Sequence, residues 1–85
     1  MKLDDKTIRL IAVGASITAN CQPCLQINIA SALKCGADEQ EIAEAIEVGK
    51  RVRQGAASKM DKFASSLDHA TLSADAANGG CGCSS

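Results

Sequence analysis

Residues 10–24 read LIAVGASITANCQPC, a mostly apolar segment that ends in two cysteines. In a helix, its apolar side chains would occupy most of the circumference, so this helix needs cover on more than one side. Asn20 is a favourable N-cap for a second helix that starts at Cys21, with Pro23 in its first turn, where the missing N–H has no intrahelical partner to lose. The stretch therefore predicts two consecutive helices with a cysteine pair at the start of the second.

The termini of the remaining helices are also marked in the sequence. Asp4 or Asp5 is a suitable N-cap for the first helix, and Gly36 suits a left-handed cap at the end of the second. Asp38 followed by Glu41 is a capping-box pattern, which predicts that a third helix begins there.

From residue 42 to residue 67, apolar side chains recur at steps of three and four, which is typical of one long helix. Gln54-Gly55 is a candidate break in it. Alternation with a period of two is nowhere sustained. The predicted fold class is therefore all-α, a small helical bundle.

The 85 residues have room for one small domain, and with 46% hydrophobic residues but only one aromatic side chain the core should be thin. We expect residues 1–69 to form the helical domain. Residues 70–85 are rich in Ser, Ala and Gly and end in a Cys-Gly-Cys pair, so we expect a disordered, flexible tail. Because the first and third helices are more apolar than a lone bundle needs, a homo-oligomer is expected, with a monomeric bundle as the alternative.

Composition argues against several partners. Nine basic and ten acidic side chains, without Trp or Tyr, provide neither a basic field nor stacking surfaces for nucleic acid. No apolar run approaches the roughly 18 residues that a membrane span needs. Acids among the first five residues are unlike a secretory signal, so we expect a cytoplasmic protein with no nucleic-acid or membrane partner.

Five cysteines are an unusual number for so short a chain: Cys21, Cys24, Cys35, Cys81 and Cys83. An odd count without a secretory signal favours redox chemistry or metal binding over a disulfide scaffold. The first two would lie at the positive end of a helix dipole, which stabilises thiolate, but their spacing equally fits half of a zinc site. Cys35 is expected to be buried and inert, or else to be a third thiol at a subunit contact.

Three stretches together resemble the AhpD-like, or carboxymuconolactone decarboxylase, family: LIAVGASITANCQPC at 10–24, ADEQEIAEAI at 37–46 and GAASKMDKFA at 55–64. The resemblance covers about two thirds of the chain and implies an all-helical fold that assembles as trimers or hexamers. In the redox-active branch, a histidine four residues after the second cysteine and a glutamate about a dozen before the first assist the cysteine pair. No decarboxylase activity is implied.

This chain matches the family's cysteine pair at Cys21 and Cys24, but it has Asn28 at the histidine position and Arg9 in the glutamate region. Asn28 can hydrogen-bond a sulfur or a water, but it cannot exchange a proton near pH 7. Peroxidase activity driven by a proton relay should therefore be weak or absent. We expect Arg9 to face solvent; if it points inward, its charge would lower a thiol pKa. His69 is expected to be a surface or capping residue.

The leading hypothesis is a thiol–disulfide redox protein, an AhpD-like oxidoreductase of disulfide exchange or antioxidant defence, without a cofactor. Cys21, Cys24 and Asn28 would form its site, and Cys81 and Cys83 would be a resolving or delivery pair. Its partner would be a disulfide-bearing or peroxiredoxin-type protein. The alternatives are a carrier of zinc, copper or arsenite that uses the same four cysteines, and a non-catalytic family member. The basic run at 50–62 is expected to be a solvated face, or else a docking surface for an acidic partner.

Overall fold

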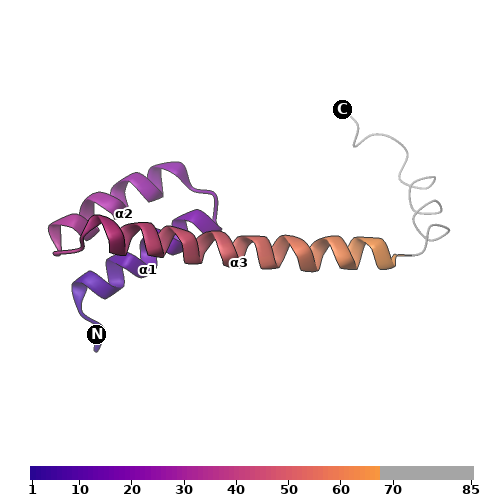
Figure 1. The fold of residues 1–85 in the computed structure, drawn as a ribbon, viewed down its shortest axis with the longest axis horizontal. Coiled ribbons are helices and arrows are strands. Elements are labelled where there is room, and N and C mark those ends of the chain that lie inside the picture. The colour runs from indigo at the N-terminus through magenta and orange to yellow at the C-terminus, as the bar shows by residue number, and fades with distance from the viewer. Residues whose placement is uncertain (68–85) are drawn as a thin grey trace.

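The computed structural model describes residues 1–67, which form three helices: α1 (Asp5–Thr18), α2 (Gln22–Lys34) and α3 (Glu39–Ser66). In Figure 1, α1 and α2 lie beside the first half of α3, and the second half of α3 extends past them as a single helix. No strand occurs among the described residues, so the all-α prediction is confirmed. The expected tail at 70–85, with its two cysteines, and His69 lie outside the described residues.

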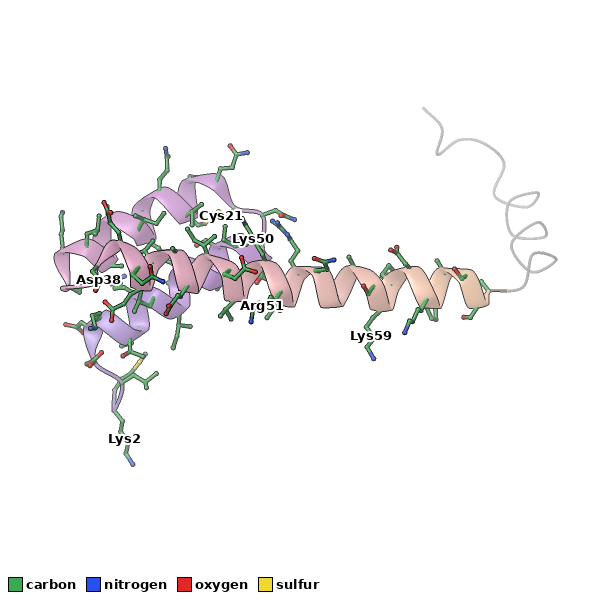
Figure 2. All side chains as sticks on the ribbon, in the orientation of Figure 1. Lys2, Cys21, Asp38, Lys50, Arg51 and Lys59 are labelled. Atoms are coloured by element: carbon green, nitrogen blue, oxygen red, sulfur yellow. A yellow bond between two sulfur atoms is a disulfide. The ribbon has the colours of Figure 1, made fainter. Side chains whose placement is uncertain are left out.

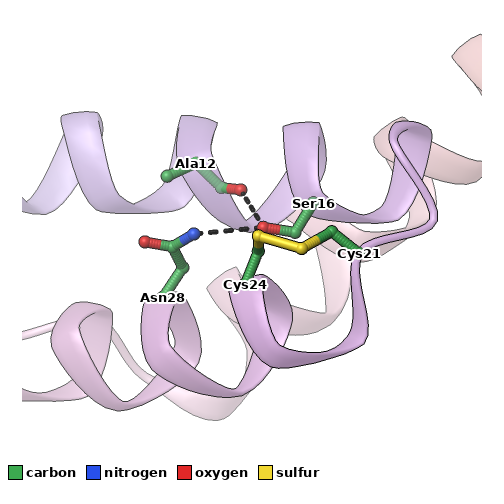
Figure 3. The surroundings of a disulfide bond; sticks show 5 residues. All are labelled: Ala12, Ser16, Cys21, Cys24 and Asn28. Carbon is green, nitrogen blue, oxygen red and sulfur yellow. Dashed lines mark hydrogen bonds between the residues drawn. A yellow bond between two sulfur atoms is a disulfide. The ribbon is translucent and has the colours of Figure 1, made fainter.

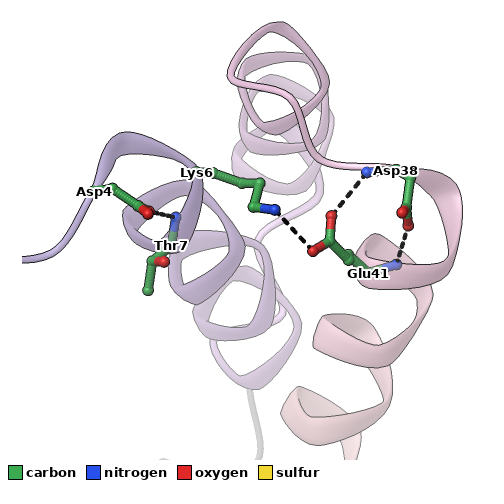
Figure 4. A network of polar contacts seen from close by, with 5 residues as sticks. All are labelled: Asp4, Lys6, Thr7, Asp38 and Glu41. Atoms are coloured by element: carbon green, nitrogen blue, oxygen red, sulfur yellow. Dashed lines mark hydrogen bonds and ion pairs between the residues drawn. The ribbon is translucent and has the colours of Figure 1, made fainter.

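The predicted starts of α1 and α3 are confirmed, as Figure 4 shows. The Asp4 carboxylate accepts the Thr7 N–H at 2.8 Å, and hydrogen bonding from Thr7 holds the pKa of this carboxyl below its ordinary value. The capping box is complete: Asp38 accepts the Glu41 N–H at 2.8 Å, and Glu41 accepts the Asp38 N–H at 3.1 Å. Glu41 also accepts a hydrogen bond from Lys6 Nζ at 3.0 Å, which joins α1 to α3 and raises the pKa of Lys6.

The end of α2 forms the left-handed cap predicted at Gly36, whose φ is +97°. The Ala37 N–H donates to the Ala32 carbonyl at 2.9 Å and the Gly36 N–H to the Leu33 carbonyl at 3.1 Å. This pair of bonds is a Schellman motif, which satisfies carbonyls that the helix end would leave unpaired.

The end of α1 has the same motif, and it corrects the expected role of Asn20. Asn20 adopts φ +56°, its N–H donates to the Ile17 carbonyl at 3.1 Å, and the Cys21 N–H donates to the Ser16 carbonyl at 3.0 Å. Asn20 therefore ends α1 and is not the N-cap of α2; that position belongs to Cys21. The prediction failed because asparagine is favoured both at N-caps and in the left-handed region.

The core lies where the three helices meet and is as thin as the composition predicts. Its buried apolar residues are Val13, Ala32, Ala37 and Ile42, flanked by the partly buried Leu10, Leu25, Ile29, Ala45 and Ile46. Helices α1 and α3 approach closely at Gly14 and Gly49. A Cβ built on Gly49 would lie 2.9 Å from Ile17 Cβ and would collide with the Gly14 carbonyl oxygen.

The expected break at Gln54-Gly55 does not occur, because α3 is continuous to Ser66. A glycine inside a helix lowers helix stability by only about 1 kcal/mol relative to alanine, and its N–H still forms the helical hydrogen bond. It therefore does not end a helix by itself. All residues from 50 to 67 are exposed. The second half of the predicted apolar seam therefore packs against nothing in the described part of the chain. None of the helices within residues 1–67 combines the length and the apolar composition that crossing a bilayer requires.

Candidate disulfide site

Cys21 and Cys24 form a disulfide at the start of α2, with their Cα atoms 5.2 Å apart. Cys21 is the N-cap and Cys24 is the third residue of the helix, so the sequence prediction was one position off for Cys21. The Cys21 side chain is partly buried, whereas Cys24 is exposed. A reactant that approaches from solvent therefore meets Cys24 first.

The backbone N–H groups in the first turn of α2 have few hydrogen-bond acceptors. Cys21 makes no side-chain capping bond, and Pro23 has no N–H. The amides of Gln22 and Cys24 have no acceptor within the helix, because the first N–H groups of any helix lack one. These amides and the helix dipole favour negative charge at this end, and the two sulfur atoms are located there.

Ser16 of α1 accepts a hydrogen bond from Asn28 of α2 next to the disulfide, as Figure 3 shows. Ser16 is 5% exposed, and its hydroxyl donates to the Ala12 carbonyl at 2.8 Å and accepts the Asn28 Nδ2–H at 3.1 Å. Its carbonyl accepts the Cys21 N–H. Asn28 is thus placed one turn beyond Cys24, against α1. Neither Ser16 nor Asn28 exchanges protons near neutral pH, so these two residues form no proton relay.

Arg53 of α3 reaches the same site from the other side. Its Nη1 donates to Asn20 Oδ1 at 2.8 Å and to the Ile17 carbonyl at 3.2 Å. Arg53 and Cys21 both line a pocket of about 190 Å³, together with Ser16, Ile17, Asn20, Gln22 and Leu25. The guanidinium is therefore held in the same pocket that Cys21 lines.

No local sequence pattern indicates this role for Arg53, which was expected only as part of the solvated basic face. The residue is 33 positions from Asn20, and the contact arises only when α3 packs on the end of α1. Ser16 was likewise not indicated, since a serine within an apolar helix has no distinctive spacing. Arg9 is exposed on α1, as expected, and does not line the pocket.

Cys35 is a free thiol at the C-cap of α2, at the opposite end of the helix from the disulfide. It is only partly buried, so the expectation of full burial was wrong. The reason is that Cys35 and Gly36 form the turn that ends α2, at the edge of the core rather than inside it.

Metal ligation by the cysteine pair would need further donors. Within residues 1–67, no group of three or more His, Cys, Asp or Glu side chains is placed to hold a metal ion. A site with four thiolates would therefore depend on Cys81 and Cys83, which lie outside the described residues.

Comparison with known proteins shows the family to which the chain belongs. The model of the carboxymuconolactone decarboxylase family matches residues 1–64. The chain is also similar to a Paracoccus denitrificans protein named "Uncharacterized protein 4 in cox locus", with 38% identity over 55 residues, which is 65% of this chain and 50% of that relative. The chain thus spans about half the length of this curated relative. No solved structure matches the chain significantly. With the family model matching most of its residues, the chain belongs to the carboxymuconolactone decarboxylase family.

Proposed function

We propose that the protein carries out thiol–disulfide exchange, accepting two electrons at the Cys21–Cys24 disulfide and passing them to a second partner. The observation that supports this proposal most is the disulfide at the positive end of α2 with Cys24 exposed. Electropositive, accessible positions of this kind stabilise the thiolate that exchange requires.

The difference in exposure assigns the two sulfur atoms different steps. A partner thiolate attacks Cys24 Sγ, a new sulfur–sulfur bond forms, and Cys21 leaves as a thiolate. Arg53 and the first-turn amides of α2 stabilise the charge on Cys21. The second thiolate of the partner then attacks the partner's own bonded sulfur and releases Cys24. The partner is oxidised to a disulfide, and the pair Cys21 and Cys24 holds two electrons and takes its protons from solvent.

In the opposite direction, the Cys24 thiolate attacks an oxidised partner and Cys21 resolves the mixed disulfide. Because Asn28 and Ser16 supply no general acid or base, the rate depends on how much thiolate is present. Antioxidant activity would then pass through a disulfide-bearing or peroxiredoxin-type protein and not through direct attack on peroxide. Cys81 and Cys83 would deliver electrons to the pair, and the reducing cytoplasm is the compartment that suits this cycle.

Trapping of mixed disulfides tests the proposal. In a full-length background with Cys35, Cys81 and Cys83 replaced by serine, the reduced protein is mixed with a small aromatic disulfide. We expect two aromatic thiols to be released per chain, since Cys21 resolves the adduct. Cys21→Ser should retain one stable adduct on Cys24, and Cys24→Ser should react more slowly.

Three results would contradict this assignment. A faster reaction at Cys21 would reverse the roles of the two sulfur atoms. Reaction of both thiols at the rate of the denatured chain would instead favour a non-catalytic family member. Native mass spectrometry of the unsubstituted chain completes the test, because a bound zinc that masks four thiols would favour the metal carrier.

A further inference from the structure

An apolar groove runs between α1 and α3. Its volume is about 440 Å³, and its lining residues are Thr7, Leu10, Ile11, Gly14, Ala15, Thr18, Ala45, Val48, Gly49 and Val52. Ile11 is 57% exposed and Val48 is 56% exposed. On α1, Ile11 is two residues from the fully buried Val13, which is a rotation of about 200°, so the groove lies on the side away from the core.

The second half of α3 carries an apolar stripe that leads away from this groove. Val52, Ala56, Met60 and Phe63 are spaced by four, four and three residues, so they share one side of the helix, and all are exposed. In Figure 2, no other helix lies beside this part of α3. Helices in proteins obtain most of their stability from packing an apolar face, so this segment needs a partner.

The charges of α3 are segregated along its length. Residues 38–49 contain five acids and no base, whereas residues 50–62 contain five bases and one acid. Two α3 helices in parallel would therefore place like charges side by side. Two antiparallel helices would place the basic half of each beside the acidic half of the other, which is favourable.

We propose that two copies of the chain pair through antiparallel α3 helices, around a two-fold axis near Gln54. This register places Phe63 of one copy opposite Ala45 of the other and Met60 opposite Val48. The large side chains of the stripe then enter a groove whose floor contains Gly14 and Gly49, so large and small residues interlock.

The same register brings Lys62 of one copy near Glu44 of the other. These two residues are 18 positions, or five full turns, apart, so they lie along the same edge of the stripe on α3. The contact is the same in both directions, so the pair closes on itself and does not grow into a filament. A second copy also covers the groove, the stripe and both charged segments at once. An acidic partner on the basic run at 50–62 would leave the groove open.

Sedimentation of the full chain under reducing conditions tests the pairing, because reductant excludes disulfide-linked dimers. We expect a dimer at micromolar concentration, and Met60→Lys should raise its dissociation constant by about a hundredfold, as at a buried interface position. Ser58→Lys is the matched control: it adds the same charge on the opposite side of α3 and should leave association intact. A monomeric wild type, or an assembly insensitive to Met60→Lys, would overturn the proposal.

Charge reversal tests the orientation. Glu44→Lys and Lys62→Glu should each weaken the dimer by about tenfold, because each replaces two attractive pairs by two repulsive ones. The double variant should recover the wild-type affinity. In a parallel dimer each residue faces its own copy, so the single reversals would leave affinity unchanged, and that result would overturn the antiparallel arrangement. Circular dichroism confirms that each variant retains its helices.

Discussion

Arg53 Nη1 donates a hydrogen bond of 2.8 Å to Asn20 Oδ1, which joins the middle of α3 to the residue that ends α1. Asn20 has a left-handed backbone there, and the next residue is Cys21. The turn that ends α1 therefore has a second effect, because it fixes a guanidinium in the pocket that Cys21 lines.

Removing this guanidinium should slow exchange. In reduced protein with Cys24 replaced by serine, Arg53→Ala is expected to raise the pKa of the Cys21 thiol and to slow its alkylation at neutral pH by about threefold to tenfold. Alkylation rates measured as a function of pH give both quantities. Arg51→Ala is the matched control, because Arg51 pairs with Glu47 and does not line the pocket. Equal effects of the two variants would contradict a local role for Arg53.

Restoring a titratable group beside the cysteines should accelerate exchange. Asn28→His places an imidazole one turn beyond Cys24, and we expect a rate increase at neutral pH of about tenfold or more. The pH profile should gain an ionisation near the ordinary histidine value of about 6.5. Asn28→Gln tests for simple loss of the Ser16 bond and should not accelerate the reaction. If the pH dependence of the exchange rate is unchanged in Asn28→His, then a side chain at position 28 does not transfer protons to or from the sulfur atoms.

The contact between α1 and α3 requires glycine at position 49. Gly49→Ala should destabilise the fold by about 1–3 kcal/mol, because its Cβ would collide with the Gly14 carbonyl oxygen and crowd Ile17. Gly55→Ala should instead stabilise α3 by up to about 1 kcal/mol, because a Cβ there meets no neighbouring atom within 4 Å. Urea denaturation in a Met60→Lys background separates these effects from dimerisation. Equal free energies of unfolding for the two variants would contradict the close approach.

Acid should weaken the start of α1. The pKa of Asp4 is lowered from 3.8 in the folded chain by hydrogen bonding from Thr7, so folding favours the ionised carboxylate. The contribution of this cap to stability is therefore complete above pH 3.8 and is lost as the pH falls through the lower folded value. Asp4→Asn should show a smaller decrease in stability over this range than the wild type. Titration of the Asp4 carboxyl by NMR gives the folded pKa directly, and a value above 3.8 would contradict the hydrogen bond.

Local chemistry decides which parts of the fold are predictable from the sequence. The capping box of Asp38 and Glu41 and the turn at Gly36 involve residues within a few positions of one another, so the sequence alone identifies them. Asn20 was misplaced because two local motifs compete for asparagine, and only the packing of α1 decides between them. The continuity of α3 at Gly55 shows that a local propensity is too small to end a long helix.

The residues of the candidate site also fall into two groups, those that the sequence identifies and those that only the packing of the helices brings together. Cys21 and Cys24 are recognisable from the sequence because a separation of three residues at the start of a helix brings their sulfur atoms together. Arg53 joins them through a contact between segments more than thirty residues apart, which no periodicity encodes. Ser16 is a similar case, since its bond to Asn28 exists only after α2 has packed on α1.

Ser16 receives the Cys21 amide and the Asn28 side chain through bonds that do not involve sulfur. Reduction of the disulfide therefore leaves both ends of the first two turns of α2, at Cys21 and Asn28, attached to α1. The oxidised and reduced forms should share one backbone, so gain or loss of electrons demands little structural reorganisation. A rigid scaffold of this kind leaves the redox equilibrium to be governed by the electrostatics around the two sulfur atoms and not by refolding.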